Sequence, residues 1–97
     1  MAKGYVIARI DVDDPEAYAL YTARTPEAIA AFGGRFLVRG GAQRAAEGAA
    51  RGRQVVIEFP DYAAACAFYD SDAYRAILPF AWAASTRDLV LVEGFDG

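Results

Sequence analysis

Four stretches of the chain alternate between apolar and polar residues with a period of two, which is the pattern of half-buried β-strands. Between the first and second stretches, and again between the third and fourth, apolar residues recur three and four positions apart, as in an amphipathic helix. The alternation predicts strands over residues 4–12, 35–39, 53–59 and 86–93. The order of elements along the chain is therefore strand, helix, strand, strand, helix, strand.

Capping residues and prolines predict where the helices begin and break. Asp14 precedes Pro15, so its side chain can accept from free amides while the proline takes the first helical position. Pro26 falls inside the first helical pattern and must kink it or split it in two. Asp61 is the expected cap of the second helical region, and Ser71 is the expected cap of a further helix within it.

This order predicts an α+β fold of the ferredoxin-like βαββαβ type, with residues 1–97 forming a single domain. With right-handed crossovers, the first and third strands are central and the second and fourth lie at the edges of an antiparallel sheet. Both helical regions then cover the same face of the sheet. The other face is left without cover from its own chain.

The two sets of alternating strand positions differ in polarity, which predicts the face that each set occupies. The wholly apolar set is expected to meet the helices, and it comprises Val6, Ala8, Ile10, Phe36, Val38, Val55, Ile57, Phe59, Val90 and Val92. The mixed set is expected on the uncovered face, and it comprises Tyr5, Ile7, Arg9, Arg35, Leu37, Arg39, Gln54, Val56, Glu58, Leu89, Leu91 and Glu93. Because the apolar members of the mixed set need cover, we predict a homodimer in which two sheets face each other as a dimeric α/β barrel.

The mixed set places one charge on each strand. In the predicted strand order these charges are Glu93, Arg9, Glu58 and Arg39, whose signs alternate, so each can pair with a neighbour. The plainer interpretation is a ladder of ion pairs that fixes the register of the sheet and the dimer. The alternative is a polar site in which Arg9 or Arg39 holds the carboxylate or enolate of a substrate.

Composition excludes several classes of function. The chain of 97 residues has a net charge of −3, with acids interleaved among its basic residues, which argues against nucleic acid and anionic membranes as partners. No window approaches a membrane span, and we expect a cytoplasmic protein. There is no histidine, and Cys66 is the only cysteine, so His-based catalysis and intrachain disulfides are excluded. We expect no metal and no cofactor.

A few further side chains are candidates for a site. Tyr18 and Tyr21 could bring phenol groups to a pocket, although packing in the core is their plainer role. Trp82 could line the mouth of a site or pack at a subunit edge. Glu47 lies in the predicted loop of residues 42–52, which we expect to be mobile. The candidate ligand-binding residues are Arg9, Arg39, Tyr5, Tyr18, Tyr21 and Trp82, and the weaker catalytic candidates are Glu58, Glu47 and Arg9.

Several short segments resemble a bacterial family of short proteins classed as a domain of unknown function. They are Phe36–Gly41, Glu47–Gly48, Val55–Pro60, Tyr69–Ser71 with Tyr74, and Asp88–Gly94, with Tyr18, Tyr21, Pro26 and the pair Gly33–Gly34. That family belongs to the dimeric α/β-barrel superfamily, which includes cofactor-free monooxygenases, lactone isomerases and chlorite-dismutase-like haem proteins. The resemblance implies the fold and the dimer, but little chemistry, because one fold serves many functions.

Three classes of function remain open at this point. The first is a homodimeric domain that binds a small molecule. The second is a cofactor-independent enzyme, similar to a monooxygenase or isomerase, acting on a small aromatic or carbonyl substrate. In that case Arg9 or Arg39 would stabilise charge and Glu58 or Glu47 would act as base. The third is a structural or regulatory dimer without a ligand. A cavity large enough for a ligand would favour the first two classes over the third.

Overall fold

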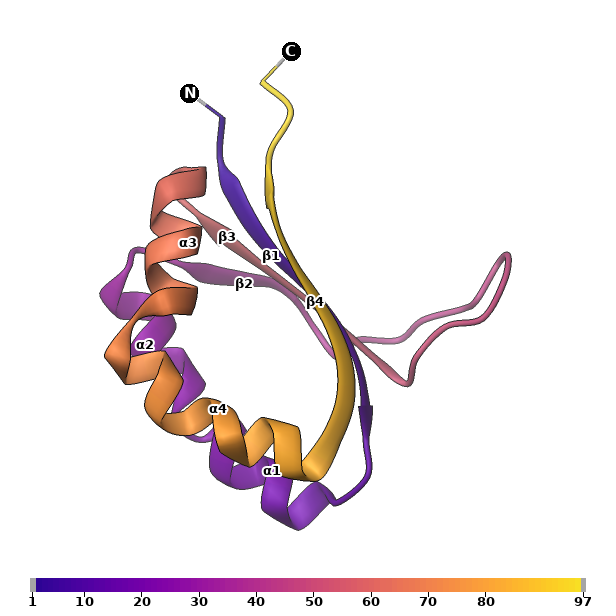
Figure 1. Ribbon diagram of the computed structural model, residues 1–97. Coiled ribbons are helices and arrows are strands. Elements are labelled where there is room, and N and C mark those ends of the chain that lie inside the picture. The colour runs from indigo at the N-terminus through magenta and orange to yellow at the C-terminus, as the bar shows by residue number, and fades with distance from the viewer. Residues whose placement is uncertain (1, 97) are drawn as a thin grey trace.

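A computed structural model describes residues 2–96, and these form a four-stranded antiparallel sheet with helices gathered on one of its faces (Figure 1). The strand order is β2-β3-β1-β4, which confirms the predicted ferredoxin-like α+β fold. The elements are β1 (Gly4–Val12), α1 (Pro15–Thr22), α2 (Thr25–Ala31), β2 (Arg35–Arg39), β3 (Arg53–Phe59), α3 (Tyr62–Asp70), α4 (Asp72–Ala84) and β4 (Ser85–Glu93).

The first helical region is split at its proline. An Asp14 carboxylate oxygen accepts from the amide of Ala17 at 3.2 Å, which caps α1 as the sequence predicts. Helix α1 ends at Thr22, and α2 begins at Thr25 with Pro26 in its first turn, where the missing amide hydrogen is tolerated. Of the two predicted outcomes, a kink or a split, the structure shows the split, with two short helices.

The second helical region follows the same logic. The Asp61 carboxylate caps α3 through the amide of Ala64 at 2.7 Å, and the Ser71 hydroxyl caps α4 through the amide of Tyr74 at 3.2 Å. Pro79 lies inside α4, which nevertheless continues to residue 84. Within residues 2–96 no helix has the length and apolar character needed to cross a membrane.

The core lies between the sheet and the helices. Side chains of β1 and β3 form its floor, and Phe59 from β3 stacks against Phe68 of α3 with ring centroids 5.1 Å apart. The Phe68 ring in turn lies 4.5 Å from the ring of Tyr74 in α4. These aromatic contacts join both helices of the second crossover, α3 and α4, to the central strand β3.

The predicted assignment of faces is wrong in β4. Val90 and Val92 lie opposite Ile7 and Tyr5 of β1, and they face away from the helices with 51% and 40% of their surface exposed. Leu89 and Leu91 instead pack against the core. The run Leu-Val-Leu-Val is apolar at every position, so its alternation carries no information about which side faces inward.

A β-bulge makes the assignment wrong in β2 as well. The register against β3 shifts between Phe36 and Val38, so that Leu37 is an extra residue in the strand. Beyond the bulge the two faces are exchanged, because one added residue reverses the alternation. Val38 therefore turns to the uncovered face and Arg39 turns towards the helices, the reverse of the sequence prediction.

The predicted charge ladder does not form. Arg9 lies opposite Gln54 and Asp88 rather than Glu58. The Glu58 carboxylate instead accepts from Arg35 Nε at 3.1 Å, as well as from the Tyr5 hydroxyl. Arg39 has left this face because of the bulge, and the alternation that turns Val92 outward turns Glu93 to the helix side.

Residues 41–51 form an arm that leaves the sheet between β2 and β3 and extends away from the helices (Figure 1). Its base is fixed to the sheet by Arg51, which pairs with Asp11 at 2.8 Å and with Asp88 at 2.9 Å. The Gly52 amide also donates to Asp11 at 2.8 Å. Residues 42–50 are all exposed, and the expected mobility of this loop stays a prediction.

Candidate ligand-binding cavity

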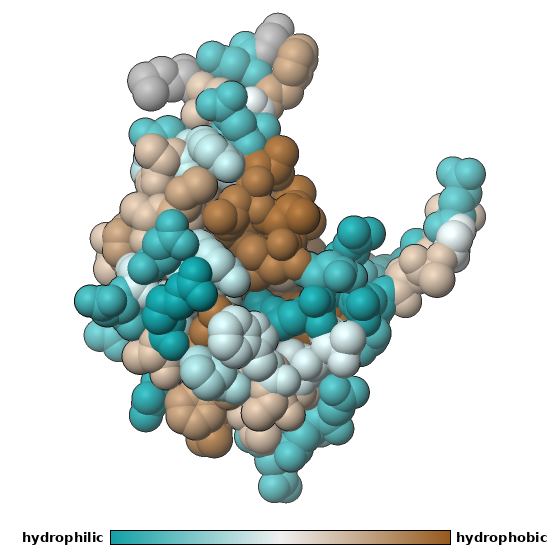
Figure 2. All heavy atoms as spheres, in the orientation of Figure 1, coloured by the Kyte–Doolittle hydropathy of each residue, from teal (hydrophilic) through white to brown (hydrophobic). Residues whose placement is uncertain are grey.

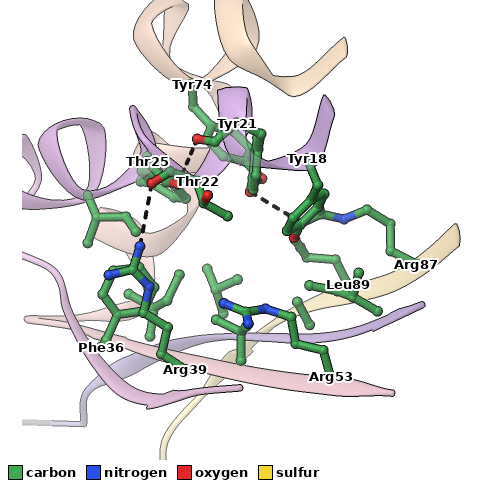
Figure 3. Close-up of a pocket in the computed structure, with 17 residues that line it drawn as sticks. Tyr18, Tyr21, Thr22, Thr25, Phe36, Arg39, Arg53, Tyr74, Arg87 and Leu89 are labelled. Carbon is green, nitrogen blue, oxygen red and sulfur yellow. Dashed lines mark hydrogen bonds between the residues drawn. The ribbon is translucent and has the colours of Figure 1, made fainter. Parts of the chain in front are cut away.

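A small cavity lies between the sheet and the helices, and it adjoins a groove on the surface with which it shares lining residues. The inner chamber has about 30 Å³ of free space and lies over residues of β1 and β3, beneath Tyr18, Tyr21 and Tyr74 (Figure 3). The outer groove has about 370 Å³ and lies between α1 and the sheet. Four residues line both spaces and so mark the passage between them: Tyr18, Thr22, Arg39 and Arg53.

Strand register directs three arginines into this cavity. Arg53 of β3 and Arg87 of β4 both lie opposite Ile10, one on each side of β1. Residues opposite one another share a face of the sheet, so both arginines lie on the same side as the buried Ile10. Arg39 joins them from β2 because the bulge places it opposite Val55. Figure 3 shows Arg39 and Arg53 extending upward from the strands, below the tyrosines of the helices.

The three guanidinium groups have few protein partners. Arg39 donates to the backbone oxygen of Thr22 at 3.4 Å, and its guanidinium lies 4.3 Å from the centre of the Phe36 ring. Arg87 donates to the Tyr21 hydroxyl, also at 3.4 Å. Both side chains are partly buried, and among residues 2–96 the buried Nε of Arg53 and Nη1 of Arg87 have no hydrogen-bond partner. Within residues 2–96, no carboxylate forms an ion pair with any of the three arginines.

Burial keeps Tyr18 and Tyr74 in their neutral form through a raised pKa. The hydroxyls of Tyr21 and Tyr74 share a buried hydrogen bond of 2.7 Å. Burial, reinforced by the neighbouring Tyr21, raises the pKa of Tyr74 far above its ordinary value. Burial also raises the pKa of Tyr18, although the positive charge of Arg87 opposes the increase. These phenols therefore offer hydrogen bonds but no basic oxygen near neutral pH.

The candidate site residues from the sequence fall into two groups. Tyr18, Tyr21 and Arg39 line the chamber. Arg9, Tyr5 and Glu58 lie on the opposite face of the sheet, Glu47 lies in the exposed arm, and Trp82 lies on α4 with 56% of its surface exposed. Of the predicted set, the structure thus brings together Tyr18, Tyr21 and Arg39. Between residues 2 and 96, no three His, Cys, Asp or Glu side chains are grouped so as to hold a metal ion.

Sequence reasoning did not single out Arg53, Arg87 or Tyr74. A usable signal was present for Arg53, because it shares the alternation of Val55 and Ile57 and so belongs to the core-facing side of its strand. A charge at a core-facing position is unusual and points to a special environment. No equivalent signal existed for Arg87, since the alternation of β4 could be interpreted either way.

The uncovered face carries an apolar strip of Ile7, Val38, Val56, Val90 and Val92, which crosses all four strands. Four of these residues are between 36% and 51% exposed, and Val56 is half-buried. Figure 2 shows hydrophobic atoms gathered along β4 at the edge of the sheet. Charged groups flank the strip at both ends, with Arg35 and Glu58 at one end and Arg9 and Asp88 at the other.

An antiparallel βαββαβ sheet with a cavity under its helices defines the class of fold, and comparison with known proteins identifies the family. The chain matches the Domain of unknown function (DUF1330) over residues 3–95 and belongs to that family. Among functionally curated proteins, none matches the chain significantly.

Solved structures share the fold at low sequence identity. A protein of unknown function from Rhodopseudomonas palustris has 16% identity and a TM-score of 0.79, with 99% of this chain and 85% of that chain covered. SnoaB, a cofactor-independent oxygenase from Streptomyces nogalater, has 16% identity and a TM-score of 0.66, with 100% and 97% covered. An antibiotic biosynthesis monooxygenase has 19% identity and a TM-score of 0.51, with 97% of each chain covered. At such identities these similarities establish the fold alone.

Proposed function

We propose that this protein is a homodimeric domain that binds a small molecule in the cavity between its helices and its sheet. The observation that carries the proposal is the inner chamber, with its donor groups, which adjoins an outer groove of about 370 Å³ and shares four lining residues with it. Ligand sites in proteins are commonly clefts of about 300–1,000 Å³ with apolar walls and a few convergent polar groups. The residues shared by the chamber and the groove give such a ligand a route inward.

The homodimer is supported by the apolar strip on the opposite face. The helices of the same chain cannot reach this strip, and a second copy supplies a surface of the same chemistry and curvature. Both signs of charge occur at each end of the strip, so a two-fold arrangement can place acids against bases. The arm extends on this same side of the sheet, where it would lie beside the second copy (Figure 1).

Binding is better supported than acid–base catalysis. No carboxylate, histidine or cysteine is among the described residues that line the chamber. The phenols stay protonated, because burial raises the pKa of both Tyr18 and Tyr74. Glu58 is paired with Arg35 on the other face, and Glu47 is in the arm. The cofactor-independent enzyme and the ligand-free dimer stay the alternative predictions of function. The cytoplasmic location also stays a prediction.

Native mass spectrometry of protein purified directly from its source tests both parts of the proposal. We expect a dimer that carries additional small-molecule mass, released by mild collisional activation. Thr22→Phe narrows the passage and should abolish retention while leaving the dimer intact. Ala23→Phe, one residue further along and outside both spaces, is the matched control. A monomer would contradict the assembly, and a dimer that takes up no small molecule under any condition would contradict the binding function.

A further inference from the structure

We infer that the ligand is an organic anion whose carboxylate, or a similar two-oxygen group, enters the inner chamber and binds Arg53 and Arg87, while its apolar body occupies the outer groove. The inference rests on the proposed binding function and names the chemical class of the ligand. It follows from three features of the cavity, namely its unpartnered donors, its uncompensated charge and its shape.

The first feature is the pair of unpartnered donors. More than nine-tenths of buried polar groups in proteins have a hydrogen-bond partner, so each exception asks for an explanation. Here Arg53 Nε and Arg87 Nη1 are both buried without one, on the two strands that flank β1. They belong to side chains that line the same chamber. An anion with two oxygens carries one acceptor for each of these donors.

The second feature is charge. Three guanidinium groups line the chamber, and an arginine cannot lose its proton to relieve the repulsion. The nearby carboxylates are engaged on the other face of the sheet, since Glu58 pairs with Arg35 while Asp11 and Asp88 pair with Arg51. Arg39 is exposed and Arg53 and Arg87 are partly buried, so their charge is left to solvent, counter-ions or a bound anion, and an anionic ligand would supply the compensating charge inside the cavity. A neutral ligand would leave the repulsion in place.

The third feature is shape. The chamber has about 30 Å³ of free space, enough for a carboxylate-sized group but not for an aromatic ring. The groove has about 370 Å³, and the side chains of Val12, Pro15 and Ala19 form part of its wall beside the Tyr18 ring. The anionic end therefore fits inside, and the body of the molecule fits outside against apolar atoms. Arg39, which lines the passage, can contact either part.

Isothermal titration calorimetry with benzoate and its neutral analogue benzamide tests this inference. Phenylacetate, 2-naphthoate and inorganic phosphate extend the series in size and polarity. We expect the aryl carboxylates to bind in competition with one another, benzamide to bind at least ten-fold more weakly, and added salt to weaken the carboxylates. Phosphate, which lacks an apolar body, should bind more weakly than benzoate.

Substitutions assign the effect to the chamber. Arg53→Gln and Arg87→Gln should each weaken benzoate at least ten-fold, whereas Arg53→Lys should retain part of the affinity because the charge remains without the fork. Arg44→Gln is the matched control, because it removes the same charge from the exposed arm, where Arg44 forms no hydrogen bond or ion pair with any of residues 2–96. Each variant is first checked for unchanged circular dichroism and oligomeric mass.

A second measurement needs no ligand. If the arginines are positioned for an anion, then Arg53→Met or Arg87→Met should raise the melting temperature of the ligand-free protein, because each removes an unpaired cation whose side chain is partly buried. A lowered melting temperature would overturn the inference and make the arginines structural. Equal binding of benzoate and benzamide, blocked by Thr22→Phe, would overturn the anion class but keep the binding function. Failure of the whole carboxylate series to bind would also overturn the anion class, and native mass spectrometry would still decide the binding function separately.

Discussion

Replacing Val90 by glutamate should break the proposed dimer. Val90 lies on the edge strand β4 opposite Ile7 of β1, and 51% of its surface is exposed on the uncovered face. In a two-fold dimer the substitution occurs twice, once from each protomer, so every unfavourable contribution is doubled. The fold itself should tolerate the change, because the side chain points away from the core.

The magnitude follows from the exposed fraction. Full burial of a valine side chain stabilises by roughly 1.5–3 kcal/mol, so covering the exposed half contributes about 1 kcal/mol per protomer. A glutamate partly desolvated between the sheets costs at least about 1 kcal/mol more at each copy. The sum is about 4 kcal/mol for the dimer. At 1.4 kcal/mol per factor of ten, the dimer dissociation constant should rise about 1,000-fold.

Sedimentation velocity over a range of protein concentrations measures this constant. The matched control is Leu20→Glu on α1, where a similar apolar side chain is 56% exposed on the helical side of the molecule. The control should leave the dimer unchanged. If Val90→Glu sediments as a dimer at concentrations where the control does, then the uncovered face is not the interface, and the apolar strip needs another partner.

Three further outcomes follow from the hydrogen bonds and pKa shifts. Tyr21→Phe leaves the buried hydroxyl of Tyr74 without its partner, so the free energy of unfolding measured by urea denaturation should fall by about 1–3 kcal/mol. The control is Tyr69→Phe, which should change that free energy little, because the Tyr69 hydroxyl forms no hydrogen bond within residues 2–96. Burial raises the pKa of Tyr74 in the folded state. The contribution of Tyr74 to stability is therefore complete below the pKa of about 10 that tyrosine has in the unfolded chain, and it declines at higher pH. Phenolate absorbance should show no titration of Tyr74 before alkaline unfolding. The Gly52 amide, assisted by Arg51, lowers the pKa of Asp11, so its contribution is present above the ordinary value of about 4 and is lost only as pH falls through the lowered value. Hydrogen exchange should thus show the Gly52 amide still protected just below pH 4, and loss of that protection there would contradict the assigned bond.

The fold could be predicted from the sequence because its signals are local and agree with one another. Asp14, Asp61 and Ser71 each precede a helix and each caps it in the structure. The predicted bounds of β1, β2 and β3 coincide with the observed ones, and β4 begins one residue earlier than expected. With these elements fixed in order, the handedness of the crossovers leaves little choice of topology.

The candidate site could be predicted only in part, because it depends on which way strand residues point. Tyr18 and Tyr21 lie on a helix whose apolar spacing identifies its inner side, so their position was accessible from the pattern. Arg87 lies on β4, where Leu-Val-Leu-Val gives no preference between the faces. Arg39 follows a bulge, and a bulge is set by long-range pairing with β3 rather than by any local pattern.

The single extra residue in β2 also changes the chemistry of the molecule. Without the bulge at Leu37, the register set by Phe36 would place Arg39 opposite Gln54 on the outer face, and the cavity would lose one of the two arginines that line both the chamber and the groove. On the outer face, the acids Glu58, Asp11 and Asp88 are paired with Arg35 and Arg51. On the inner face, the arginines have no acid to pair with. The two sides of the same strands therefore suit the two proposals differently. A face whose acids are paired can meet a copy of itself, while a face with excess positive charge favours the proposed anion.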